Sequence, residues 1–206
     1  MSQFLSGLIL AAGSSTRMGQ PKQLLPLDGR PLLQHVVDAV AASRLDEIIL
    51  VLGHRAQEIE GALRFPPQRT VRIVTNPDYA EGQSTSLRLG LRTASAEAQA
   101  AAILLGDQPQ ITTALIDRVA AAFATANAPI VRPAYTDARG RRVPGHPVFL
   151  ARRIWPDVET LRGDQGARAL LTAHPDWLVE VPIEGDPTPD IDTWEDYQRA
   201  RHEPLG

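Results

Sequence analysis

The chain has 206 residues, and its 43% hydrophobic and 22% charged residues are the proportions of an ordinary globular protein. A formal net charge of -3 argues against general affinity for nucleic acid, which requires a basic face that neutralises phosphates. Cysteine is absent, which excludes a disulfide framework, and no apolar run approaches the ~18 residues that span a bilayer.

The same features bear on domain organisation and on location. A chain of 206 residues is long enough for one well-filled α/β domain and short for two. No linker rich in proline, glycine or serine divides it, so we expect a single domain over residues 1–206. The first residues lack a basic region and lead straight into a strand pattern, which predicts that there is no signal peptide. We therefore expect a cytoplasmic protein without membrane contact.

Short β-branched or leucine-rich runs alternate with longer helical patterns along the chain. The runs predict strands at residues 7–11, 47–52, 71–75, 101–105, 130–133 and 177–182. Helical patterns predict six helices: one after Pro31, one over about 56–63, one that ends near 93, one from Thr112, one over about 168–173 and one after Thr193. This alternation predicts an α/β fold with a doubly wound, mostly parallel sheet. The run at 101–105 is apolar on both faces, so we place it in the middle of the sheet.

A glycine- and serine-rich loop follows the first strand. Its small residues let backbone N–H groups converge, its serines offer hydroxyl donors, and Arg17 and Lys22 add two cations. Together these properties make an anion cradle that suits a polyphosphate. Lys22 is the single lysine among 21 basic residues, and its compact ammonium suits a phosphate held by a mobile point charge. We interpret residues 8–22 as a loop that binds a nucleoside triphosphate.

The spelling of this loop excludes two better-known phosphate loops. The Walker A pattern fails because Gly19 is followed by Gln20 instead of lysine and then serine or threonine. The dinucleotide pattern G-x-G-x-x-G fails because Ser15 stands where the second glycine is required. The loop therefore belongs to another class of nucleotide-binding protein.

Three polar segments are placed to cap helices. They are the serines Ser84 and Ser86 in the loop over residues 76–87, the pair Gly163 and Asp164, and the T-x-x-D pattern from Thr193 to Asp196. Capping is the structural interpretation of each segment.

Acidic residues stand out at two places. Asp107 directly follows the strand at 101–105. Open α/β sheets bind ligands just past the carboxyl ends of central parallel strands, so Asp107 is a candidate site residue. The alternative is that it caps a turn ahead of the next helix. Near the end of the chain, Asp190 and Asp192 lie on the same side if the backbone there is extended.

Arginines and a rigid turn follow the fifth strand. Arg139 and Arg141 fit a solvated face, which is the usual place for a run of like charges. His146 lies between Gly145 and Pro147 in a rigid turn. It either hydrogen-bonds the loop backbone or contacts a ligand, and the residues leave both roles open.

Four stretches resemble the signatures of the MobA-like nucleotidyltransferases. The first, L-A-A-G-S-S-T-R-M-G-Q-P-K-Q-L-L-P over residues 10–26, is similar to the family's opening signature without a gap. Gly-Asp-Gln-Pro at 106–109, Gly-His-Pro-Val at 145–148 and Asp-Ile-Asp-Thr-Trp-Glu-Asp at 190–196 follow in the family's order. Trp194 stands where the family has proline, a change that the first turn of a helix tolerates. The resemblance covers almost the whole chain.

The resemblance implies a fold, a nucleotide site and a metal. The implied fold is the Rossmann-like type of the nucleotide-diphospho-sugar transferases. The residues that match the family's nucleotide site are Leu10, Ala11, Ala12, Gly13, Ser14, Ser15, Arg17, Lys22, Gly82, Gln83, Ser84 and Asp107. The implied catalytic residues are Arg17, Lys22 and Asp107, and the implied Mg²⁺ ligands are Asp107 and Asp192. His146 and Arg142 are assigned to acceptor binding.

Within the family, the Ala11-Ala12-Gly13 spelling and the Gly-His-Pro turn look most like the molybdenum cofactor cytidylyltransferases. The resemblance then implies transfer of CMP from CTP to the terminal phosphate of molybdopterin, with release of pyrophosphate. The implied partners are CTP, this phosphorylated small-molecule acceptor and, in transient contact, a molybdoenzyme or its chaperone.

Two alternatives stay open. One is an NTP transferase that acts on another phosphorylated small acceptor or uses GTP. The other is a repurposed member of the family that transfers no nucleotide, such as a cofactor carrier or an oxidoreductase on the same scaffold.

Overall fold

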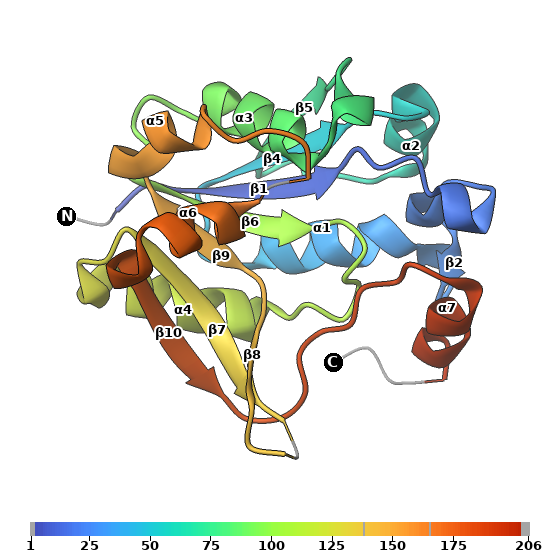
Figure 1. Cartoon of the computed structure of the whole chain (residues 1–206). Coiled ribbons are helices and arrows are strands. Elements are labelled where there is room, and N and C mark those ends of the chain that lie inside the picture. Colours follow the sequence, from blue (N-terminus) through green and yellow to red (C-terminus); the bar gives the residue numbers. More distant parts are fainter. Residues whose placement is uncertain (1–2, 138, 165, 203–206) are drawn as a thin grey trace.

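An eight-stranded sheet runs through the molecule, and Figure 1 shows helices packed above and below it. The computed structural model describes residues 3–137, 139–164 and 166–202. The strands lie in the order β10-β7-β9-β6-β1-β4-β5, and β8 pairs with β7. Their bounds are Leu5–Ala11 (β1), Glu47–Leu52 (β4), Thr70–Thr75 (β5), Ala100–Leu105 (β6), Ile130–Thr136 (β7), Arg142–Pro144 (β8), Val148–Ala151 (β9) and Leu178–Ile183 (β10). Two short strands, Pro26–Leu27 (β2) and Arg30–Pro31 (β3), form a separate pair.

Most neighbouring strands in the large sheet are parallel. β1 lies between β4 and β6 and is parallel to both, β5 is parallel to β4, and β10 is parallel to β7. β9 runs antiparallel to β6 and β7, and β8 runs antiparallel to β7. The predicted mostly parallel sheet, with β6 inside it, is therefore confirmed. The sequence pattern does not predict β8 and β9, because strands of three or four residues beside prolines show no clear periodicity.

Helices cover both faces of the sheet. They are α1 (Leu32–Ala42), α2 (Ala56–Ala62), α3 (Gln83–Thr93), α4 (Thr113–Ala126), α5 (Trp155–Val158), α6 (Ala167–Ala173) and α7 (Trp194–Ala200). α1 and α4 lie on one face, and α3, α5 and α6 lie on the other (Figure 1). The doubly wound arrangement is therefore confirmed. Within the described residues, no helix is both long and apolar enough to cross a membrane.

The central strands supply two apolar cores with alternate residues. Ile9 of β1 belongs to the cluster that α1 and α4 complete, whereas Leu8 and Leu10 belong to the cluster that α3 and α5 complete. β4 and β6 divide their residues in the same way. Because side chains alternate along a strand and both faces are buried here, these strands read in the sequence as continuous apolar runs.

Two of the predicted helix caps are wrong. The N-cap of α3 is Gly82, and the two serines lie inside the helix. The N-cap of α6 is Gly166, so Gly163 and Asp164 lie outside that helix. The predicted threonine cap of α7 is confirmed, with Thr193 as the N-cap.

A third apolar cluster joins the two ends of the chain. It consists of Met18, Leu25, Leu27, Leu32, Ile191, Tyr197 and Ala200. The Tyr197 hydroxyl donates to the Pro26 carbonyl oxygen at 2.5 Å. In Figure 1, α7 accordingly lies beside the segment that follows β1. The last helix therefore packs against the predicted nucleotide loop.

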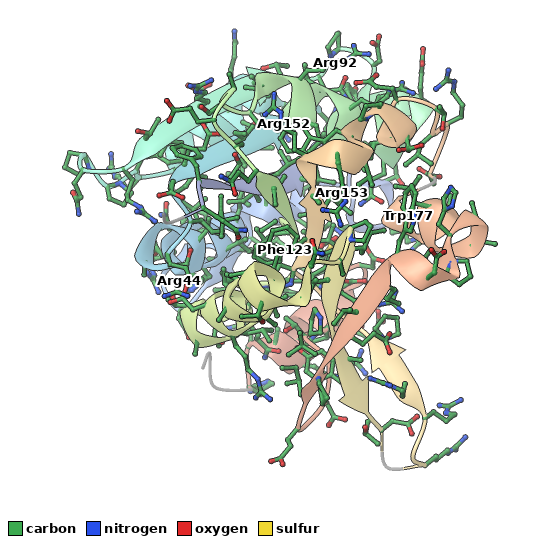
Figure 2. All side chains as sticks on the ribbon, turned by 90° about the vertical axis from the view of Figure 1, so that its left-hand side faces the viewer. Arg44, Arg92, Phe123, Arg152, Arg153 and Trp177 are labelled. Atoms are coloured by element: carbon green, nitrogen blue, oxygen red, sulfur yellow. The ribbon has the colours of Figure 1, made fainter. Side chains whose placement is uncertain are left out.

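Figure 2 views the molecule from the end where β1 and β6 begin, which is opposite the end that carries the predicted nucleotide loop. Two arginines labelled there tie loops together through backbone carbonyls. Arg152 Nη1 donates to the carbonyl oxygens of Ser95 and Ala98, and Arg153 Nη2 donates to that of Asn127. These arginines serve the fold at the edge away from the carboxyl ends of β1 and β6.

Candidate functional site

The loop after β1 is fastened by a buried glutamine that the sequence pattern does not single out. Gln23 Nε2 donates to the carbonyl oxygens of Ala11 and Gly13 at 3.0 and 3.2 Å. Ser15 adopts a left-handed φ of 52°, and its Oγ accepts from the Lys22 backbone N–H at 3.1 Å. These contacts fix the shape of the loop, so the side chain of Lys22 starts from a defined point.

A glycine lets the end of β6 approach this loop closely. The Gly106 N–H donates to the Leu10 carbonyl oxygen at 2.9 Å, and a Cβ on Gly106 would lie 2.7 Å from the Ala11 Cβ. The next residue is Asp107, and its carbonyl oxygen accepts from the Ile191 N–H at 3.0 Å. The C-terminal segment is thereby attached at the point where β6 ends.

The capping box of α7 sets the position of Asp192. Thr193 Oγ1 accepts from the Asp196 N–H at 3.2 Å, and Asp196 Oδ2 accepts from the Thr193 N–H at 2.8 Å. The Asp192 N–H donates to the same Oδ2 at 3.2 Å. Hydrogen bonds from Thr193, first of all from its hydroxyl, lower the pKa of Asp196 to about 2. Asp192 therefore extends from an anchored turn.

Lys22 joins the two aspartates. Its Nζ lies 2.7 Å from Asp107 Oδ2 and 2.7 Å from Asp192 Oδ1. Burial alone would lower the pKa of the Lys22 ammonium, but the two carboxylates outweigh burial and raise it above its ordinary value. Arg17, whose side chain is 72% exposed, lies 3.5 Å from Asp192 Oδ2. The fold thus brings together Arg17, Lys22, Asp107 and Asp192.

Asp190 turns away from this cluster towards another partner. Its Oδ1 accepts from Gln108 Nε2 at 2.8 Å. Burial raises the pKa of Asp190, and the charge of nearby Asp107 raises it further. Although Asp190 and Asp192 are two residues apart, they bind different groups.

A cavity of about 440 Å³ opens beside the Lys22 cluster. The predicted nucleotide-binding residues that line it are Leu10, Ala11, Ala12, Gly13, Ser14, Lys22, Gly82, Gln83 and Asp107. Its lining also includes residues that were not predicted to bind the nucleotide, among them Tyr79, Ser86 and Asp164.

Three predicted nucleotide-binding residues stand outside this lining. Ser15 braces the loop, and Arg17 reaches the cluster through Asp192. Ser84 is fully buried, and its Oγ has no hydrogen-bond partner within the described ranges. Because α3 begins at Gln83, Ser84 points into the interior, whereas Ser86, about 200° further round the helix, reaches the cavity.

A second cavity of about 780 Å³ adjoins the first. The two cavities share the lining residues Leu10, Gln83, Leu105 and Asp164. His146, a predicted acceptor residue, lines the larger cavity together with Arg132, which sequence reasoning missed. Arg142, the other predicted acceptor residue, stands outside both linings. It is exposed on β8, where its Nε lies 3.2 Å from Glu180 Oε2, so its position does not support a direct acceptor contact.

The start of α3 is held by the segment before α6, at the junction of the two cavities. Gly82 has a φ of +110°, and a Cβ there would lie 2.3 Å from the Gly163 carbonyl carbon. The Ser84 N–H donates to the Gly163 carbonyl oxygen at 3.0 Å, and the Gln83 N–H donates to Asp164 Oδ1 at 3.3 Å. Asp164 therefore binds the first turn of α3 and lines both cavities.

We expect His146 to make folding stability depend on pH between about 4 and 6.5. Burial lowers the pKa of this imidazole from 6.5 to about 4, with Asp107 raising it and Arg132 lowering it to smaller extents. As the pH falls below 6.5, His146 binds a proton in the unfolded chain but stays neutral in the folded chain, so the folded state loses stability. The melting temperature of His146→Gln should fall less steeply from pH 6.5 to 4.5 than that of the parent. Parallel curves would contradict a neutral His146.

Asp107 and Asp192 offer what a magnesium ion requires. Mg²⁺ binds hard carboxylate oxygens and uses only one or two of them. Asp107 Oδ1 is buried and has no hydrogen-bond partner in the described part of the chain, so this oxygen can accept a bond from a ligand or a metal ion. Among the described residues there is no group of three or more His, Cys, Asp or Glu side chains that would hold a metal alone. An ion at Asp107 and Asp192 would therefore be shared with ligand oxygens and water.

The fold and the site together define a class. A doubly wound α/β sheet carries an anion loop after its first strand, and a lysine joins two aspartates at the carboxyl ends of β1 and β6. Open α/β sheets bind ligands at this edge, and the fold is that of the Rossmann-like nucleotidyltransferases. The chain belongs to the MobA-like NTP transferases, because the model of the MobA-like NTP transferase domain matches residues 7–177.

Three curated relatives span nearly the whole chain. The purine catabolism protein PucB of Bacillus subtilis is 35% identical over an alignment of 208 positions, which covers 97% of each chain. Nicotine blue oxidoreductase of Paenarthrobacter nicotinovorans is 31% identical over 201 residues, or 95% of each chain. Molybdenum cofactor cytidylyltransferase of Escherichia coli is 28% identical over 194 residues, or 94% of each chain. The family therefore contains members with different named roles.

Solved structures agree with this assignment. Rv0371c of Mycobacterium tuberculosis superposes with a TM-score of 0.84 at 29% identity, covering 98% of this chain and all of that one. A manganese complex of the same mycobacterial protein gives a TM-score of 0.80 at 28% identity, with the same coverage.

Proposed function

We propose that this chain transfers CMP from CTP to the terminal phosphate of molybdopterin and releases pyrophosphate. The observation that carries the proposal is the Lys22 ammonium between Asp107 and Asp192, beside a cavity lined by the loop after β1. The cytidylyltransferase relative and the Ala11-Ala12-Gly13 spelling support cytidine as the nucleoside and molybdopterin as the acceptor.

The proposed reaction needs no covalent intermediate with the protein. An oxygen of the acceptor phosphate forms a bond to the α-phosphorus of CTP, and the bond from that phosphorus to the bridging oxygen of pyrophosphate breaks in line. The chain has to orient the two phosphates and balance negative charge. The loop amides face the triphosphate, and Lys22 and Arg17 bring positive charge to the α-phosphate and to the leaving pyrophosphate.

A divalent cation belongs to this proposal. Asp107, Asp192 and Asp164 make the surroundings acidic, and a nucleoside triphosphate adds further negative charge. Mg²⁺ bound by Asp107 and Asp192 would supply the positive charge that lets a triphosphate enter. The manganese complex of a structural relative supports a divalent ion on this scaffold.

Pyrophosphate release tests the proposal directly. The protein is incubated with CTP, Mg²⁺ and molybdopterin, and the nucleotide product is identified by mass. We expect pyrophosphate and the cytidine dinucleotide of the cofactor in equal amounts. The same assay with other phosphorylated acceptors covers the alternative of a different substrate, and turnover with one of those alone would replace molybdopterin.

We expect CTP to be preferred over GTP, and Ala12→Gly to weaken that preference. Ala12 is buried, 6% exposed, and lines the smaller cavity, where its methyl group takes space that a purine needs. Removing one methyl group in such a cavity changes discrimination by about tenfold or more. The measurement is the ratio of kcat/KM for CTP to that for GTP in parent and variant. An unchanged ratio would mean that Ala12 does not select the base.

A second candidate function follows from the relatives. Of the three relatives described above, the two that are more than 30% identical are named for purine catabolism and as an oxidoreductase of nicotine blue. An oxidoreductase that uses a nicotinamide cofactor would consume it without releasing pyrophosphate. Monitoring NAD(P)H absorbance with nicotine blue, beside the pyrophosphate assay, therefore separates the two functions.

A further inference from the structure

The larger cavity contains an arginine that the nucleotide loop does not use. Arg132 of β7 lines this cavity, and its side chain is 19% exposed. Its Nη2 and Nε donate to Glu180 Oε1 of the neighbouring strand β10 at 2.8 and 3.2 Å. The other oxygen of Glu180 pairs with Arg142. Two arginines thus share one carboxylate, and of the two it is Arg132 that belongs to the cavity wall.

The cavity wall around Arg132 is mostly apolar. Its apolar lining residues include Leu87, Ile103, Val148, Leu171 and Leu178. Apolar walls suit the faces of a planar ring, and a guanidinium suits the hydrogen-bond acceptors on the edge of such a ring. The combination therefore favours a flat heterocycle over a sugar or an aliphatic alcohol.

The strand register places Arg132 far from the Lys22 cluster. Ala102 of β6, Phe149 of β9 and Val131 of β7 lie in one row across the sheet, and Ile103 and Arg132 are the next residues of β6 and β7. β9 lies between β6 and β7, so Arg132 lies two strands, or about 10 Å, to the side of β6. β6 itself continues to Leu105, about 7 Å past Ile103, before the turn that contains Asp107. Leu105, the last residue of β6, lines both cavities. A molecule that spans the two cavities would have one end beside Asp107 and the other beside Arg132.

His146 stands between these two ends. It lines the larger cavity, and its electrostatic neighbours are Asp107 and Arg132. Burial lowers the pKa of His146 to about 4, so the imidazole is neutral at pH 7. Among the described residues that line this cavity, positive charge at neutral pH therefore comes from Arg132.

We propose that Arg132 selects the acceptor by donating hydrogen bonds to the edge of a planar heterocycle, at the end of the acceptor opposite its reacting phosphate. This inference rests on the proposed function, because it takes the larger cavity as the acceptor site. A pterin has a carbonyl oxygen and a ring nitrogen on one edge, and arginine binds such a pair with both arms of its fork. Glu180 holds the guanidinium in place for this contact.

A pterin without a phosphate tests the contact separately from catalysis. 6-Hydroxymethylpterin is fluorescent, and its dissociation constant can be measured by titration without CTP. We expect Arg132→Gln to weaken binding by about tenfold or more, the usual effect of losing charged hydrogen bonds in a cavity. Arg142→Gln, which alters the other partner of Glu180, should stay within about twofold. Equal binding by the parent and Arg132→Gln would overturn the assignment.

Two further variants guard against a folding defect. Arg132→Lys keeps the positive charge beside Glu180 but lacks the planar fork. The double variant Arg132→Gln/Glu180→Gln removes both charges of the half-buried pair and leaves Arg142, which is exposed, to the solvent. Both should melt close to the parent and still bind the pterin about tenfold more weakly. Parental pterin affinity in these two variants, with a parental melting temperature, would also overturn the assignment.

Steady-state kinetics separate this inference from the proposed function. In the transfer assay, Arg132→Lys should raise KM for molybdopterin by about tenfold and leave KM for CTP within about twofold. Transfer with a parental KM for molybdopterin would reject the role of Arg132 and keep the proposed function. Arg132-dependent pterin binding without any CMP transfer would reject the proposed function and keep the role of Arg132.

Discussion

Lys22→Arg is expected to lower kcat/KM for CTP by about a hundredfold, although it preserves the charge. The Lys22 ammonium lies 2.7 Å from one oxygen of each of two aspartates, and a wide planar guanidinium cannot take that place between loop amides. A displacement of reacting groups by about 1 Å has an effect on the order of a hundredfold. The measurement is pyrophosphate release at varied CTP.

The matched control is Arg92→Lys, which makes the reverse exchange. Arg92 pairs with Glu159 at the edge of the molecule that Figure 2 faces, away from the nucleotide cavity, so this variant should keep the parental rate. A Lys22→Arg enzyme within about threefold of the parent, under ~0.7 kcal/mol of transition-state stabilisation, would show that any cation suffices at this position.

Lys22→Ala adds a stability readout. It leaves Asp107 and Asp192 close together without the cation between them, so we expect a lower melting temperature as well as lost activity. Because the pKa of Lys22 is raised above 10.5, its stabilising contribution is fully present at pH 7 and is lost only at higher pH. Mg²⁺ should raise the melting temperature of this variant more than that of the parent. Equal shifts would argue against a metal site at the two aspartates.

Asp107→Asn is expected to lower turnover by orders of magnitude while the fold stays intact. The substitution removes one of the two carboxylates offered to Mg²⁺ and one of the two partners of the Lys22 ammonium, but little packing. The measurements are kcat across a Mg²⁺ titration and a melting curve. Parental rates at saturating Mg²⁺ would remove Asp107 from the metal site.

Asp190→Asn is the control for that experiment. Asp190 is an acidic neighbour of Asp107, but it accepts a hydrogen bond from Gln108. The side-chain oxygen of an asparagine at position 190 can accept the same bond. We expect its turnover and its Mg²⁺ dependence to resemble those of the parent. Equal losses in the Asp107 and Asp190 variants would point to a general effect of acidic charge.

The parts of this structure that were predictable from the sequence are those whose determining residues are neighbours in the chain. The strands β1, β4 and β6 are buried on both faces, so their apolar runs show clearly. The anion loop follows β1 directly, and its small residues and its lysine stand side by side in the sequence. The capping box of α7 was predictable for the same reason, because Thr193 and Asp196 are three residues apart.

The residues that were missed take their roles from distant partners. Asp164 follows a glycine, as a helix cap often does, but it binds the first turn of α3, which lies 81 positions earlier. In the sequence, Arg132 is one polar residue in a short strand. Its position in the cavity wall and its pairing with Glu180 of another strand become visible only in the structure. Arg142 stands in an arginine-rich stretch, and nothing in that stretch indicates that its side chain lies outside the cavity. Only the folded sheet separates the two.

The position of Asp192 also bears on what a shortened chain would contain. The Lys22 ammonium and the Asp192 carboxylate are 170 positions apart, and the matched family domain ends at residue 177, before Asp192. The sheet ends with β10 at Ile183, so the strands and the pairing of Lys22 with Asp107 use only residues that precede Asp192. A polypeptide that stops before residue 192 would therefore contain every strand of the sheet but present a nucleotide cleft that lacks half of its acidic pair.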